Sequence, residues 1–110
     1  MATSKDYIEF VCSQIEEAGS VRFRKMFGEY MVYLDEKPVL LVCDNTVFVK
    51  IIDPLREFLK NAETGFPYDG SKEHYILDIE DKELSVTVSK ILAKNYKSKP
   101  KGAKNKTSVQ

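Results

Sequence analysis

Three short apolar segments that follow one another between residues 30 and 52 constrain the fold of this chain more than any other feature. They cover Tyr30–Leu34, Val39–Cys43 and Thr46–Ile52, and only four and two residues separate them. Connections this short join antiparallel neighbours, because a parallel pair needs a crossover of about a dozen residues. Asp44-Asn45 fits a tight turn, since both residues tolerate positive φ. The sequence therefore predicts an antiparallel meander.

A fourth strand is predicted before these three, at residues 21–27. Apolar and charged residues alternate in its opening VRFR, as they do along a half-buried strand. Lys25 then takes the position due for an apolar residue. We therefore expect a bulge near Lys25-Met26, or a bend at Gly28, to restore the register.

Helices are predicted on both sides of the strands. Residues 4–18 place apolar side chains at helical spacing, after a capping-box pattern at Thr3–Asp6 and before Gly19. Asp53-Pro54 is typical of a helix start, and apolar spacing extends that helix to about residue 65. A last strand at 75–79 and a helix capped by Asp81 follow. The order α-ββββ-α-β-α indicates an α+β domain, an antiparallel meander sheet with flanking helices.

Charge divides the 110-residue chain into a body and a tail. Residues 1–93 carry 11 basic and 17 acidic side chains, a net charge of −6, whereas residues 94–110 carry six lysines and no acid. We expect one domain over residues 1–96 and a disordered, lysine-rich tail over 97–110. A chain of this length buries only about two thirds of its unfolded surface, so a homodimer would add stability.

The location predicted from the sequence is cytoplasmic. There is no apolar run of membrane-spanning length and no basic segment followed by an apolar one at the N-terminus, so we expect neither a membrane partner nor a signal peptide. Cys12 and Cys43 each sit in an apolar context, which fits free thiols in a reducing compartment. A single bridge between them is the alternative.

Several motifs in this frame resemble the N-terminal domain of the TfoX/Sxy proteins. The family pattern has an Arg-x-Met-Phe-Gly strand entry, then Gly-Tyr-Gly-x-Tyr, then an apolar hairpin that ends in a lysine. Here these elements read RKMFG at residues 24–28, EYMVY at 29–33 and FVK at 48–50, and Phe66-x-Tyr68-x-Gly70 and Tyr75 also match. Glu29 and Met31 stand where the family has glycine, which puts a close approach by a partner at this strand in doubt.

The resemblance covers about residues 3–95 and implies a regulatory or protein-interaction module, with no reaction attached. It also implies a fold like that of secretion chaperones, a bent antiparallel sheet with flanking helices, often dimeric. The second, helical domain that longer family members carry has no counterpart here.

The candidate partner-binding residues are Arg24, Lys25, Gly28, Tyr33 and Lys50. Two cations on one face of a sheet suit a phosphate or an acidic partner. The alternative is that Arg22 and Arg24 line a solvent face and pair with acids such as Glu29. Met26-Phe27-Gly28 fits either an exposed docking pair or a core pair beside a glycine that supplies a special conformation.

No catalytic set, metal site or cofactor site is predicted. His74 is the one histidine of the chain, it has no cluster of metal ligands around it, and we expect it on the surface or in a loop. Neither cysteine has a visible activating neighbour. The function that the family resemblance implies, and that these residues do not oppose, is that of a non-enzymatic regulatory or interaction domain with a protein partner.

The alternative function is non-specific nucleic-acid binding through the tail. Its candidate residues are the six C-terminal lysines, which would release counterions from a phosphate backbone. They are Lys94, Lys97, Lys99, Lys101, Lys104 and Lys106. A solubilising tail, or one that folds back on its own acidic body, is the simpler interpretation.

Overall fold

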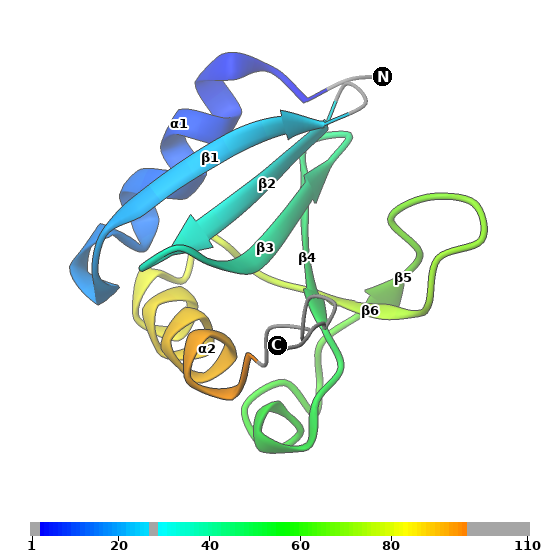
Figure 1. Ribbon diagram of the computed structural model, residues 1–110. Helices are drawn as coiled ribbons and strands as arrows, with labels where there is room; N and C mark the ends of the chain where they lie inside the picture. The colour runs from blue at the N-terminus through cyan, green and yellow to red at the C-terminus, as the bar shows by residue number, and fades with distance from the viewer. Residues whose placement is uncertain (1–2, 27–28, 97–110) are drawn as a thin grey trace, which may run out of the picture.

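The computed structural model describes residues 3–26 and 29–96 of the chain (Figure 1). In chain order its elements are α1 (Lys5–Gln14), a 3-10 turn η1 (Glu16–Ala18), β1 (Val21–Met26), β2 (Glu29–Leu34), β3 (Lys37–Cys43), β4 (Thr46–Lys50), a 3-10 turn η2 (Asp53–Leu55), β5 (Thr64–Gly65), β6 (His74–Ile76) and α2 (Lys82–Asn95). The strands form one antiparallel sheet in the order β1-β2-β3-β4-β6-β5. The predicted α+β class is confirmed, and β1 to β4 form the predicted meander.

The core lies between one face of the sheet and the two helices. Cross-strand pairing places Val32 opposite Leu40 and Val42 opposite Val47, so these side chains share a face. They pack in one buried cluster with residues of α1 and α2, and Figure 1 shows α1 behind β1. The fully buried members include Ile8, Val11, Ile15, Val32, Leu34, Leu40, Val42, Val47, Val49 and Val88. Each such side chain contributes about 1.5–3 kcal/mol by leaving water.

The helix ends follow the predicted capping chemistry with one shift. Ser4, rather than Thr3, caps α1, because the Tyr7 N–H donates to Ser4 Oγ at 3.1 Å. Thr3 is buried, and its hydroxyl accepts the Asn45 N–H of the β3–β4 turn at 3.1 Å. Asp81 caps α2 as predicted, through its Oδ1 and the Leu84 N–H at 3.1 Å.

The helix predicted to start at Asp53-Pro54 does not form beyond its first turn. The segment is the 3-10 turn η2 followed by irregular turns to residue 62. Leu55 and Leu59 are buried and the Leu59 N–H reaches the Leu55 carbonyl at 2.9 Å, but the Ala62 N–H bonds only to Leu59. Phe58 is 52% exposed, so the apolar spacing does not make one continuous buried stripe.

The predicted bulge near Lys25-Met26 is wrong. β1 pairs with β2 without interruption, from Val21 opposite Leu34 to Met26 opposite Glu29. The irregularity falls instead between β2 and β3, where the register shifts at Val32/Tyr33. Gly28 lies outside the described residues, so the bend expected there remains a prediction.

The last predicted strand is shorter than expected and has a partner that the sequence did not reveal. β6 covers His74–Ile76 rather than 75–79, and the two-residue β5 pairs with its outer edge. His74, expected in a loop or on the surface, lies half-buried in β6 opposite Lys50. These pairings add β6 and β5 to the sheet beside β4.

Two tight turns close the meander, at Asp35-Glu36 and at Asp44-Asn45. All four residues have positive φ, between 50° and 69°. Two-residue hairpin turns with positive φ at both positions are favoured, because their backbone twist matches the right-handed twist of the flanking strands. Asp35 is also held by Ser20, whose N–H donates to Oδ1 at 2.9 Å. A Cβ on Gly19 would lie 2.8 Å from both Asp35 carboxylate oxygens and would displace them, and the φ of 155° at this position is one that other residues rarely adopt, which favours glycine here.

Candidate functional site

The second face of the sheet carries neither α1 nor α2, and we call it the open face. The strand register places five of its side chains in one row across the sheet, because each lies opposite the next on the neighbouring strand. This row runs Arg24, Met31, Leu41, Phe48 and Ile76. Arg22, Tyr33, Lys50 and His74 flank it on the same face. The open face therefore joins an apolar centre to a basic border.

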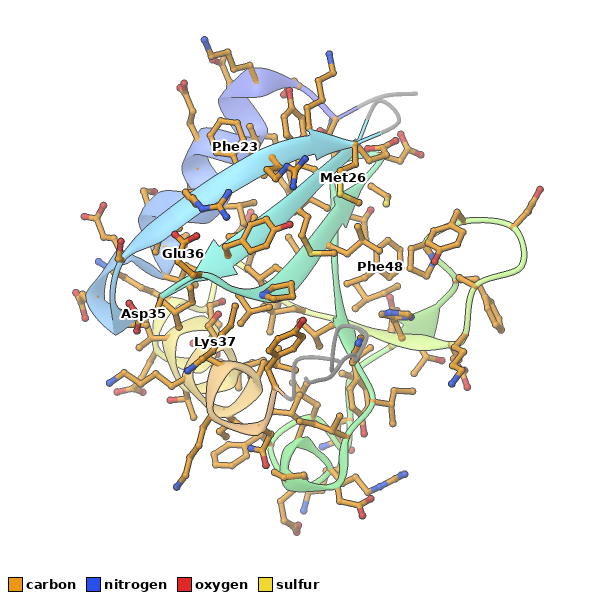
Figure 2. The ribbon with its side chains drawn as sticks, in the orientation of Figure 1. Phe23, Met26, Asp35, Glu36, Lys37 and Phe48 are labelled. Atoms are coloured by element: carbon orange, nitrogen blue, oxygen red, sulfur yellow. The ribbon has the colours of Figure 1, made fainter. Side chains whose placement is uncertain are left out.

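The apolar centre of the open face is accessible at β2 and β3 and covered at β4. Met31 and Leu41 are half-buried, whereas Phe48 is 7% exposed. The His74 ring stands edge-on to the Phe48 ring with centroids 6.5 Å apart, and a Cβ on Gly65 would contact Phe48 at 3.5 Å. In Figure 2, Phe48 lies between β4 and the 66–73 loop. The open face is thus accessible at β2 and β3, whereas at β4 the neighbouring residues His74 and Gly65 cover it.

Arg22 is committed to contacts within the protein. Its Nε and Nη2 donate to the Glu36 carboxylate at 2.8–3.0 Å, and its guanidinium lies 4.2 Å from the centre of the Tyr33 ring. This hydrogen bonding raises the pKa of Arg22 and lowers the pKa of Glu36. Both side chains are exposed, so the pair adds little stability. The expected pairing of Arg22 with an acid is present, with Glu36 as the partner.

The predicted partner-binding residues do not form one cluster. Arg24 and Lys50 share the open face, but β2 and β3 separate their strands, a backbone spacing of about 14 Å. Lys25 points to the opposite face, because it lies opposite Tyr30 in the register. Neither Arg24 nor Lys50 forms an ion pair with any residue that the structure describes. These two cations are available to a partner, one at each side of the apolar centre.

Glu29 and Met31, the two departures from the family's glycines, have separate places. The Glu29 Oε1 accepts the Thr3 hydroxyl at 2.8 Å and the Asp44 N–H at 3.1 Å. Glu29 therefore connects β2 to Thr3, which precedes α1, and to the β3–β4 turn. The glycine that the family has at this position could make neither side-chain contact. Met31 adds an apolar side chain to the middle of the open face.

The described residues offer little for catalysis. Cys12 and Cys43 are free thiols, and burial raises the pKa of each to about 11, which keeps them protonated at neutral pH. Within residues 3–26 and 29–96, no group of three or more potential ligands is placed to hold a metal ion. Neither described helix has the length and apolar character needed to cross a bilayer.

A groove that the sequence did not reveal lies between the open face and the 66–73 loop. Its volume is about 700 Å³, and its lining includes Leu41, Phe48, Lys50, Lys72 and His74. A second hollow of about 410 Å³ lies between the 57–63 segment and the chain after β6. Only the tertiary fold shows that this loop lines a groove together with β3 and β4.

The tail lysines are almost entirely outside the described residues. Lys94 is exposed in the last turn of α2, where a cation suits the helix dipole. Lys97, Lys99, Lys101, Lys104 and Lys106 lie beyond residue 96.

Two comparisons with known proteins bear on this arrangement. The family model described as the TfoX N-terminal domain matches residues 13–96. A protein from Spirochaeta aurantia, described as an uncharacterized 12.7 kDa protein in the trpE 5' region, is 40% identical over 114 aligned residues, which cover 97% of this chain and 96% of that protein.

Proposed function

The chain belongs to the TfoX N-terminal domain family, and from this premise we propose that it is a small non-enzymatic regulatory domain that binds a partner protein through its open face. The observation that carries the proposal is the one-sided packing of the helices. Both helices cover the face of Val32 and Val42, which leaves the row through Met31 and Leu41 without helix cover.

The composition of the open face fits a protein-binding surface. Aromatic residues, methionine and arginine are enriched in interface cores, and the row combines Met31, Phe48 and Arg24. A contiguous apolar row on an uncovered sheet face is a feature of interaction sites. Arg24, which forms no ion pair with the residues that the structure describes, adds an attachment point for an acidic group of the partner. Tyr33 supplies an aromatic side chain that Arg22 already holds in place.

A homodimer and a cytoplasmic location complete the proposal. Cys12, half-buried, and Cys43, buried, are both free thiols, and free cysteines suit a reducing compartment, where they persist. A dimer would supplement the modest core of a chain of 110 residues. Sedimentation equilibrium at two protein concentrations tests the dimer, which a single monomer mass at both would contradict.

The partner-binding proposal is tested by quantitative affinity capture from cells of the source organism. The tagged wild-type chain is compared with Arg24→Glu and with the control Lys90→Glu, which reverses an exposed charge on α2. We expect Arg24→Glu to reduce the bound partner at least fivefold and Lys90→Glu to leave it unchanged. Equal capture by all three chains would contradict the assignment of the open face.

A further inference from the structure

The groove beside β4 has the size and lining of a small-molecule site. Its volume of about 700 Å³ falls within the range of about 300–1,000 Å³ that such sites occupy. Its floor is apolar and includes Leu41, Phe48, Ile51 and Ile52, all from β3, β4 and the residues just after β4. The 66–73 loop supplies the opposite wall, so the hollow exists before any ligand binds.

The charge of the groove is opposite to that of the body of the protein. Residues 1–93 carry a net charge of −6, yet the ionised side chains that line the groove are Lys50, Lys72 and Glu73. Glu73 keeps its charge, so these three side chains sum to +1, and its Oε2 is turned to Thr64, whose hydroxyl donates to it at 2.7 Å. Neither lysine forms an ion pair with a described residue. The groove is thus a basic site in an acidic domain, and it favours an anion.

His74 places a further polar group at the same end of the groove. Its Nδ1–H donates to the Lys72 carbonyl at 2.7 Å, and a carbonyl oxygen only accepts, so Nε2 is the nitrogen left for other contacts. The strand register sets His74 opposite Lys50. Its ring also packs edge-on against Phe48. The polar end and the apolar floor therefore meet at His74.

We propose that this groove binds a small amphipathic anion, one carboxylate on an apolar chain or ring. Lys50 and Lys72 hold the carboxylate by charge-assisted hydrogen bonds, and the apolar part lies on Leu41 and Phe48. The proposal goes beyond partner binding, because the ligand is a free small molecule. The groove shares Met31, Leu41, Phe48 and Lys50 with the open face, but its test is separate, because Arg24, the residue changed in the partner test, is not among the residues that line the groove.

The test is a ¹H–¹⁵N NMR titration of the full chain with sodium decanoate, kept below its micelle-forming concentration. Decyltrimethylammonium serves as the matched probe with the same chain length and the opposite charge. We expect saturable shifts for Phe48, Lys50 and His74 with decanoate, and at least tenfold weaker binding of the cationic probe. Equal affinity for the two probes, or no saturable shift with decanoate, would overturn the proposal.

Variants separate the charged end from the apolar floor. Replacing both lysines, Lys50→Gln with Lys72→Gln, should weaken decanoate binding about tenfold or more and should not weaken binding of the cationic probe, because the charge that repels that probe is removed. The control Lys90→Gln on α2 should bind decanoate like the wild type. Wild-type decanoate affinity in the double variant would refute the role given to the lysines. A matching ¹H–¹⁵N spectrum away from the groove shows that the double variant is folded.

Discussion

Leu40 and Leu41 are the same residue type at adjacent positions of β3, and they point to opposite faces of the sheet. Leu40 is 0% exposed and lies in the cluster packed against the helices, whereas Leu41 is half-buried on the open face. Leu40→Ala loses the transfer free energy of the side chain and leaves a closed cavity, which costs about 3 kcal/mol within a usual range of about 2–5. Leu41→Ala opens space that water already reaches, so it should cost about 1 kcal/mol or less.

Urea unfolding followed by circular dichroism measures both differences, with an unchanged m-value as the check that the denatured state is the same. In a domain of this size each kcal/mol lowers Tm by about 5 °C, so Leu40→Ala should lower Tm by about 15 °C. An equal loss for Leu41→Ala would refute the reasoning, because it would mean that the open face is covered in the free protein. A loss that grows with protein concentration would identify the cover as a second copy.

Three further predictions concern single groups. Gly19→Ala should reduce the free energy of unfolding by about 2–3 kcal/mol in a urea titration, since its Cβ would meet the turn carboxylate at 2.8 Å and φ is 155°. Cys12 and Cys43 should react with a disulfide reagent at pH 8 at least about tenfold more slowly in the native protein than in urea, because burial raises both pKa values to about 11. A raised pKa favours the neutral thiol, so this contribution to stability is complete below the unfolded pKa near 9 and is lost as the pH rises towards 11. The pKa of Glu36, followed by NMR, should lie below its ordinary value and return towards it in Arg22→Gln, and the lowered pKa means that any stability it adds is lost as the pH falls.

The parts of the fold that the sequence predicted are those set by local periodicity and capping. The meander followed from three apolar segments with short turns, and Asp81 marked the start of α2 correctly. Segment 53–62 was misassigned because Leu55 and Leu59 have helical spacing, yet packing buries them from an irregular turn. β5 has two residues, which is too short to leave a periodic signal.

The site was less predictable, because it depends on which face each residue takes. Arg24 and Lys25 are neighbours in β1, so their side chains point to opposite faces of the sheet. The expected bulge would have changed the face to which Lys25 points. The groove depends on a contact between strands that lie far apart in the chain, the pairing of Lys50 with His74. No local pattern reports such a pairing.

The central claim is that the open face of the sheet is the partner-binding surface. Photo-crosslinking in cells of the source organism tests it most directly, with p-benzoylphenylalanine in place of Leu41 on the open face or in place of Phe10 on the exposed side of α1. The account predicts a covalent adduct with another protein from position 41 and none from position 10. An adduct from position 10 with none from position 41 would contradict it.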